Sequence, residues 1–135
     1  MIKRLVSVIL GVIFILSLTN AFAVEMQPYA STLILSNRIS ISNSGSTITA
    51  EASITTKVIA DKLGFSSIKI QVKQGTQWVT VKSVSSQYKT NGASYTYTLT
   101  YTGTAGNEYR AVAGFYAEDE GVSETRSGTS STLSI

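Results

Sequence analysis

The chain has 135 residues, of which 11 are Lys or Arg, 8 are Asp or Glu, and none is cysteine or histidine. Without these two residue types it lacks disulfides, thiol nucleophiles, Ser-His-Asp triads and the usual zinc ligands, so catalysis would have to rest on carboxylates, lysine or tyrosine. The length suits a domain that is stabilised by packing alone.

The N-terminal segment has the features of a secretory signal peptide. Two basic residues precede the apolar run Leu5–Leu18, and Ala21 and Ala23 suit cleavage after Ala23. The alternative is an uncleaved membrane anchor, but polar residues interrupt the run before the roughly 20 apolar residues that a span needs. The sequence predicts a secreted, extracellular or cell-wall-associated protein, with a signal peptide at residues 1–23, a single domain at residues 24–135 and no membrane span after cleavage.

Much of the net positive charge lies in this segment, at Lys3 and Arg4, and the remaining chain is nearly neutral. Binding to nucleic acid by counterion release needs a clustered excess of Lys and Arg. Nucleic acid is therefore not an expected partner.

The remaining chain alternates apolar and polar residues between clusters of Ser, Asn, Gly and Thr, which is typical of an all-β domain. The first expected strand places Leu33, Leu35, Ile39 and Ile41 on one face, with a bulge or bend at Asn37–Arg38. The second strand is expected to turn its small and apolar residues inward: Ile48, Ala50, Ala52, Ile54, Thr56, Val58 and Ala60. After it, the segment Asp61–Phe65 breaks the alternation and predicts a turn, with Leu63 and Phe65 closing one end of the core.

The next two strands are expected to form a hairpin. Gln74-Gly75-Thr76-Gln77 has glycine in the first central position, which is typical of a two-residue type II′ loop. The expected inward residues are Ile68, Ile70 and Val72, and the loop pairs Val72 with Val79 and Ile70 with Val81.

This register sends Trp78 to the outer face beside Lys73, and it sets Lys69 opposite Lys82, a like-charge pair. A three-residue loop would bury Trp78 instead, but it would turn the two valines outward and Lys82 inward. With the two-residue loop, five residues share the outer face of the hairpin: Lys69, Gln71, Lys73, Trp78 and Thr80.

A polar loop is expected at residues 85–94, where Asn91-Gly92 favours a turn. The strand after it alternates threonines with inward residues: Tyr95, Tyr97, Leu99 and Tyr101. The bulky tyrosines fit a core whose opposing residues are small.

The following strand begins just past a turn at residues 103–107, and its inward residues are Tyr109, Ala111, Ala113, Phe115 and Ala117. Its start resembles the sixth strand of immunoglobulin-like and fibronectin type III domains, where a tyrosine bonds back to the preceding loop. Ala111 stands where immunoglobulins carry a cysteine, so the resemblance is to the disulfide-free, fibronectin-like branch. Tyr109, Ala111 and Phe115 are expected to be structural. With a last strand in residues 122–135, the count of about seven strands favours a two-sheet antiparallel sandwich.

A closer resemblance is to a family of small secreted single-domain proteins of unknown function from Gram-positive bacteria. The matching segments are Asp61-Lys62-Leu63-Gly64 with Ser66-Ser67-Ile68, the hairpin Gly75-x-x-Trp78-x-x-Val81, and Gly103-Thr104-Ala105-Gly106 leading to Tyr109 and Phe115-Tyr116-Ala117-Glu118. The resemblance implies the exported single domain but lends no activity.

The sequence offers two candidate sites. The outer face of the hairpin, with Trp78, Lys73, Lys69, Gln71 and Thr80, can stack on a sugar ring or anchor a protein contact, although Trp78 can equally serve to cover the sheet. Three consecutive acids, Glu118, Asp119 and Glu120, could gather around Ca²⁺, but side chains on a tight turn diverge and a three-residue hairpin turn with left-handed Gly121 is favoured.

No catalytic residues, metal or cofactor are expected, because Glu51, Asp61 and Glu108 have no evident carboxylate partner. The favoured function is a non-catalytic binding module for an extracellular glycan or protein. The alternative is a structural protein that assembles by pairing its edge strands, which the low charge of the last strand permits.

Overall fold

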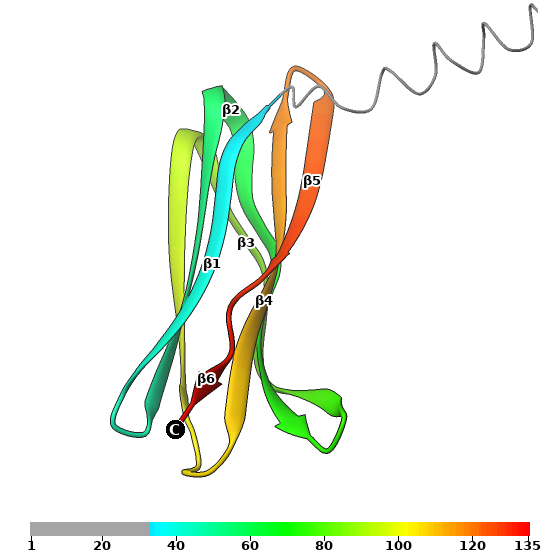
Figure 1. Ribbon diagram of the computed structural model, residues 1–135. Coiled ribbons are helices and arrows are strands. Elements are labelled where there is room, and N and C mark those ends of the chain that lie inside the picture. Colours follow the sequence, from blue (N-terminus) through cyan, green and yellow to red (C-terminus); the bar gives the residue numbers. More distant parts are fainter. Residues whose placement is uncertain (1–32) are drawn as a thin grey trace, which may run out of the picture. The chain divides into compact units, whose positions relative to one another are not determined.

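A computed structural model describes residues 33–135, and the predicted signal peptide lies outside the described residues. Figure 1 shows the strands, which all pair in antiparallel fashion, so the predicted all-β class is confirmed. The six strands are β1 (Ile34–Ser44), β2 (Thr47–Gln74), β3 (Gln77–Thr102), β4 (Glu108–Asp119), β5 (Val122–Thr129) and β6 (Leu133–Ser134). Between residues 33 and 135 there is no helix that could cross a membrane.

The strands form one curled sheet in the order β1-β2-β4-β5, with β3 paired to β2 and β6 paired to β4. The first half of β2 lies between β1 and the second half of β3, whereas its second half lies between the first half of β3 and β4. The described residues form six strands instead of about seven, because β2 and β3 each run through two of the predicted strands while the predicted last strand is divided into β5 and β6.

A corner interrupts the pairing of β2 with β3 between Thr55 and Ala60. Thr56 is buried there, and its hydroxyl donates a 2.7 Å hydrogen bond to the Val58 carbonyl, so the buried polar group is satisfied. Val58, predicted to point inward, is 47% exposed because the alternation ends at this corner. The turn predicted at residues 61–65 is wrong, since that segment continues β2.

Two further predicted boundaries were wrong. Residues 85–94, predicted as a loop, belong to β3, where Ser86 and Asn91 take positive φ values that kink the strand without ending it. The segment predicted as the last strand is divided between β5 and β6, and β6 pairs with the start of β4.

The core lies inside the curl, and the predicted inward residues of β2 and β4 supply most of it. Phe65, in the second half of β2, joins the parts of the sheet: its ring centroid lies 5.6 Å from that of Tyr95 and 5.8 Å from that of Phe115. The buried apolar residues are Leu33, Ile34, Ile48, Ala50, Ala52, Ile54, Ala60, Leu63, Phe65, Ile68, Ile70, Val72, Leu99, Tyr109, Ala111, Ala113, Phe115 and Ala117. The three predicted inward tyrosines of β3 are partly buried against them.

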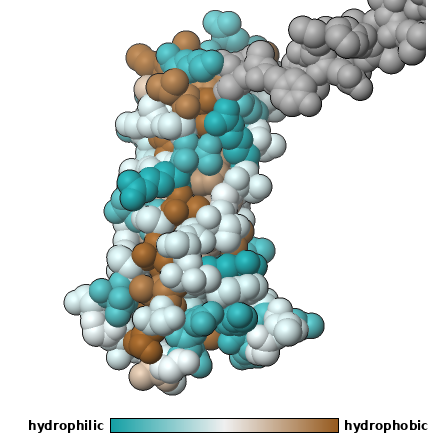
Figure 2. Space-filling model, viewed as in Figure 1, coloured by the Kyte–Doolittle hydropathy of each residue, from teal (hydrophilic) through white to brown (hydrophobic). Residues whose placement is uncertain are grey.

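Side-chain bonds connect the two edge strands β1 and β5. Glu124 accepts hydrogen bonds from the backbone amides of Leu33 (2.9 Å) and Ile34 (2.8 Å), while Arg126 donates to the Ile34 carbonyl (3.1 Å). Figure 2 shows apolar residues in a broken band on this side of the molecule. The partly buried apolar residues that β1 and the C-terminal segment contribute to the core are Ile39, Ile41, Leu133 and Ile135. These contacts close the curl.

A β-bulge in the hairpin of β2 and β3 changes the predicted register. The two-residue loop is confirmed, with Gly75 at a φ of 63° and Val72 paired with Val79. The predicted Ile70–Val81 pair is wrong, because a shift leaves Val81 unpaired and sets Lys82 opposite Ile70. The shift also sets Lys69 opposite Ser83, which removes the like-charge pair.

The bulge predicted at Asn37–Arg38 in β1 was also misplaced. The register of β1 against β2 shifts between Ile34 and Ser36, and Asn37 and Arg38 pair regularly with Ile54 and Ser53. Leu35 is therefore 60% exposed, although it was expected to face inward.

The start of β4 has the hydrogen bond between a tyrosine and the preceding turn that the resemblance to fibronectin type III domains implies. The Thr104 amide donates a 2.8 Å hydrogen bond to the Tyr109 hydroxyl oxygen, and Tyr109 is only 2% exposed. The bond fixes the turn at residues 103–107 against the first residues of β4.

Replacing Tyr109 with phenylalanine is expected to lower the free energy of unfolding by about 1–2 kcal/mol, because the ring stays in the core while the Thr104 amide loses its acceptor. Urea unfolding followed by circular dichroism measures the loss. Tyr97→Phe, on an edge segment of β3, is the matched control and should change stability by less than about 0.5 kcal/mol. Equal effects of the two substitutions would contradict a role for the bond.

Candidate binding face

Trp78 lies directly after the tight loop that joins β2 to β3. It is paired with Lys73 on the neighbouring strand, while the adjacent pair, Val72 and Val79, faces the other side of the sheet. Val72 is buried and Lys73 is exposed, so the sheet surface that carries Trp78 is the one turned away from the core. Trp78 itself is half-buried, which means that neighbouring side chains cover part of the indole.

Arg110 of β4 provides that cover. Its guanidinium carbon lies 4.4 Å from the centroid of the Trp78 ring, a distance typical of a cation–π contact. Its Nε donates a 2.9 Å hydrogen bond to Oε1 of Gln71, whose Nε2 donates a longer one, 3.3 Å, to the Thr80 hydroxyl. We call Trp78, Arg110, Gln71, Thr80 and Lys73 the Trp78 face.

The Trp78 face draws on three strands, because Gln71 pairs with Thr80 of β3 on one side and with Arg110 of β4 on the other. The hydrogen bond from Arg110 Nε to Gln71 helps to hold the guanidinium group over the indole. Among residues 33–135 no other hydrogen bond from the Arg110 guanidinium is present, which leaves its two terminal nitrogens able to donate to a ligand.

The structure brings together four of the five residues predicted for this surface. Lys69 lies on the far side of the Val81 bulge, paired with Ser83 and Val112, and no hydrogen bond or ion pair in the described part of the chain joins it to the others. Lys73 lies 3.9 Å from Glu108, but both side chains are nearly half exposed and such pairs contribute little to stability.

The sequence did not place Arg110 or Glu108 beside the predicted surface, although Glu108 was considered as a carboxylate. Both occupy outward positions of β4, in alternation with the buried Tyr109 and Ala111. The alternation marks them as outward-facing. That Arg110 reaches Trp78 and Glu108 reaches Lys73 depends on β4 pairing with β2, which no local sequence pattern shows.

The acidic hairpin between β4 and β5 holds its carboxylates apart. Its loop has two residues, Glu120 and Gly121, both at positive φ, so the predicted three-residue turn was wrong while the left-handed Gly121 is confirmed. Glu118 accepts a 2.6 Å hydrogen bond from the Tyr116 hydroxyl, and the Glu120 amide donates to Asp61. Within residues 33–135 no three acidic side chains gather closely enough to hold a metal ion.

An aromatic cluster covers the middle of β2 at Gly64, which pairs with Tyr88 on one side and Tyr116 on the other. The two tyrosine rings meet edge to face, with centroids 5.7 Å apart, and Lys62 Nζ lies 4.3 Å from the Tyr88 centroid. Aromatic side chains often cover a strand glycine in this way. The hydrogen bond to Glu118 raises the pKa of the Tyr116 hydroxyl above its usual value.

Because folding raises this pKa, the stabilisation from the Tyr116–Glu118 pair is fully present below about pH 10 and is lost as the pH rises through the folded-state value. Glu118→Gln is expected to lower the pKa of Tyr116, measured by NMR titration of its ring resonances. Glu120→Gln, which removes a carboxylate from the neighbouring turn, is the control. A Tyr116 titration that both variants leave unchanged would contradict the assignment.

The Trp78 face therefore combines a held aromatic ring, a guanidinium group with donors to spare and hydrogen-bonding side chains from three strands. This combination suits recognition by stacking and hydrogen bonding. Neither a family model nor a curated protein matches the chain.

Proposed function

We propose that the protein is a secreted, non-catalytic binding module whose Trp78 face contacts an extracellular or cell-surface glycan or protein. One observation carries the proposal: the Arg110 guanidinium lies over the Trp78 indole, and Gln71 accepts a hydrogen bond from that arginine. Ordering two such side chains costs conformational entropy, which a contact with the sheet or with a ligand would offset.

The chemistry of the Trp78 face suits both kinds of ligand. An indole stacks on the apolar face of a pyranose ring, while guanidinium, amide and hydroxyl groups bond to its hydroxyls. Tryptophan and arginine are also the residues that most often dominate the energy of protein–protein contacts. The proposal therefore assigns recognition to Trp78 and Arg110, and orientation to Gln71 and Thr80.

We further propose that the curled sheet belongs to the immunoglobulin-like and fibronectin type III-like sandwiches. Three features support this. The first half of β2 pairs with β1 and its second half with β4, while the two halves of β3 pair with opposite halves of β2, so each long strand would contribute to both layers of a sandwich. Phe65 packs against Tyr95 in the core, and the Tyr109 hydroxyl bonds to the preceding turn.

The proposal that the protein is secreted rests on the apolar segment Leu5–Leu18 and the small residues after it.

Edge-strand assembly is the alternative function. It is favoured by β3, which pairs only with β2 and so leaves one side open along its length. Several features of β3 oppose it: the bulge at Val81, the kinks at Ser86 and Asn91, and the charges of Lys82 and Lys89. Bulges and edge lysines are devices that keep edge strands from pairing with other chains. We therefore favour the binding module.

The test is retention of the purified protein on bacterial cell walls, common polysaccharides and host-surface proteins. Trp78→Ala is expected to weaken binding by at least about tenfold, because it removes the central aromatic contact. Leu35→Ala, which removes an exposed apolar side chain from β1, is the control and should bind normally. Undiminished retention of Trp78→Ala would overturn the proposal, and a protein that binds nothing but forms higher oligomers would favour edge assembly.

A further inference from the structure

The sheet surface that carries Trp78 continues to a second aromatic group. Tyr88 of β3 and Tyr116 of β4 both pair with Gly64 of β2, and we call them the tyrosine pair. The next residue of β2, Phe65, is buried, so the two tyrosine side chains point away from the core. Like the Trp78 ring, both are partly exposed. One face of the sheet therefore presents aromatic rings at two places.

β4 sets the distance between these two places. Arg110, which lies over the Trp78 ring, and Tyr116 are six positions apart on a strand whose alternation is regular. At a rise of about 3.3 Å per residue, the two ends of the surface lie roughly 20 Å apart. One sugar ring could not reach both ends, whereas an extended chain of sugars would.

Small hydroxyl side chains cover the sheet next to the tyrosine pair. Ser67 of β2 pairs with Gly114 of β4 and with Ser85 of β3. A Cβ at Gly114 would lie 2.3 Å from the Ser66 Oγ, so this serine lies over the glycine. A chain that runs from one end to the other could exchange hydrogen bonds with these hydroxyls.

The composition of the surface favours a glycan over a protein. Protein interfaces have an apolar core, whereas the outward positions between Trp78 and Tyr116 combine aromatic rings with polar groups. The strongly exposed large apolar residues within residues 33–135 lie elsewhere, and they are Leu35, Val58, Ile59, Val79 and Val122.

The charge of the surface favours an anionic chain. The outward positions of β4 and of the second half of β2 carry four cations and two glutamates. Both glutamates have partners, Lys73 and the Tyr116 hydroxyl. The outward positions of β1 and of the first half of β2 carry only one cation, Arg38, and one acid, Glu51. Charge complementarity steers and selects a partner. The charged residues of the surface are Lys62, Lys69, Lys73, Arg110, Glu108 and Glu118.

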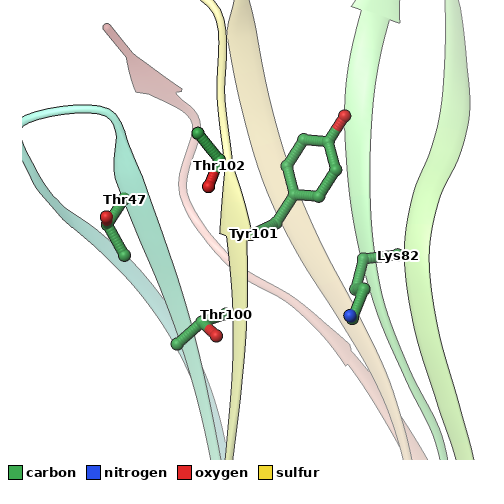
Figure 3. Close-up of a pocket in the computed structure, with 5 residues that line it drawn as sticks. All are labelled: Thr47, Lys82, Thr100, Tyr101 and Thr102. Atoms are coloured by element: carbon green, nitrogen blue, oxygen red, sulfur yellow. The ribbon is translucent and has the colours of Figure 1, made fainter.

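The pocket in Figure 3, at the open side of β3, has no such continuity. Thr100 and Thr102 alternate with Tyr101 along β3, so they lie on the opposite face of the sheet. Within residues 33–135 no hydrogen bond or salt bridge joins the Lys82 ammonium to the other lining residues.

We propose that the surface from Trp78 to the tyrosine pair binds a linear acidic polysaccharide, a ligand class that rests on the binding function proposed above. Its sugar rings would stack on the aromatic groups at the two ends. Carboxylates of its uronic acid units would pair with Arg110 and with Lys69, which lies between the ends. The competing explanation is that the tyrosine pair only covers the strand glycine.

Calorimetric titration of the purified protein with oligogalacturonate, a linear chain of uronic acid units long enough to span both ends, tests the proposal. The monomer galacturonic acid should bind much more weakly because it reaches one end only. The neutral chain of a cello-oligosaccharide should also bind more weakly. Added salt should weaken the binding of oligogalacturonate, because it screens exposed charges.

Tyr88→Ala is expected to weaken the binding of oligogalacturonate by at least about tenfold, whereas Tyr88→Phe keeps the ring and should bind normally. Lys69→Glu reverses an exposed charge without changing the aromatic packing, and it should weaken binding by a similar factor. Arg38→Glu, the matched reversal on β1, should bind normally.

Full affinity of Tyr88→Ala and Lys69→Glu, or an absence of oligogalacturonate binding, would overturn the proposal. Polyphosphate binding as tight as that of oligogalacturonate would overturn the role of the sugar rings. If Trp78→Ala still weakens retention on another ligand, the function proposed for the Trp78 face stands without the polysaccharide, so the two proposals can fail separately.

Discussion

Replacing Phe65 with alanine is expected to lower the free energy of unfolding by about 3–5 kcal/mol, the usual cost of deleting a buried aromatic ring. Phe65 is fully buried and contacts both Tyr95 of β3 and Phe115 of β4. Its removal would leave a cavity where the two halves of the curled sheet meet. Urea unfolding, followed by circular dichroism, gives the change directly.

The control for this substitution is Val122→Ala, which shortens a side chain that is 51% exposed. It should change the free energy of unfolding by less than about 0.5 kcal/mol, as most surface substitutions do. A loss below about 1 kcal/mol for Phe65→Ala would show that the ring is not central to the packing described above.

Gly64→Ala is expected to lower the free energy of unfolding by about 2–3 kcal/mol or more. The new methyl group has no space, and the backbone at this position has no freedom to move. A Cβ at this position would lie 2.1 Å from the Gln87 carbonyl oxygen and 2.9 Å from the Tyr88 Cα, both on the neighbouring strand. The φ of Gly64, 153°, is also one that residues with side chains rarely adopt. β2 and β3 would have to separate beside the Tyr88–Tyr116 contact.

Gly45→Ala separates the effect of the backbone conformation from the effect of the steric clash. Gly45 has a left-handed φ of 59°, but a Cβ there would meet no atom within 4 Å. Its substitution should cost about 1–2 kcal/mol, the price of the backbone conformation alone. Chemical denaturation of both variants gives the comparison. If Gly64→Ala is no more damaging than Gly45→Ala, the close approach of β3 to β2 at this point is wrong.

Local alternation was enough to predict the core residues of β4 and of the second half of β2, although it failed for Leu35 and Val58. Every residue from Tyr109 to Ala117 that was expected to face inward is buried, and the same holds for Ile68, Ile70 and Val72. Period-two alternation depends only on which face of a strand meets the core, and the sequence shows it directly. The two-residue loop at Gly75 was predictable for a similar reason, since its turn type requires glycine.

The continuity of the long strands could not be predicted in this way. Gly64 and Asn91-Gly92 suggested turns, because residues that permit turns also permit kinks inside a strand. Asn91 takes a positive φ while β3 continues through it. The register shift at Val81 is equally hidden, because nothing in its own side chain distinguishes a bulged residue from a paired one.

At the candidate surface, too, the local structure could be predicted from the sequence whereas the long-range contacts could not. The pairing of Trp78 with Lys73 follows from the hairpin loop, whereas the contact of Trp78 with Arg110 depends on which strand lies beside β2. In the regular register Lys82 would lie on the outer face, whereas the register shift at Val81 pairs it with the buried Ile70, and the local sequence does not show this. Long-range pairing, more than local structure, determines which chemistry comes together on this sheet.

Titration of Trp78 fluorescence tests the central claim most directly, because Trp78 is the one tryptophan in the chain and its emission reports on the proposed face alone. With soluble fragments of whichever glycan or protein retains the protein, we expect saturable quenching or a spectral shift. Its midpoint should agree with the affinity measured by retention, and Arg110→Gln should weaken both. A ligand that is retained with full affinity while the Trp78 emission stays unchanged would contradict the claim.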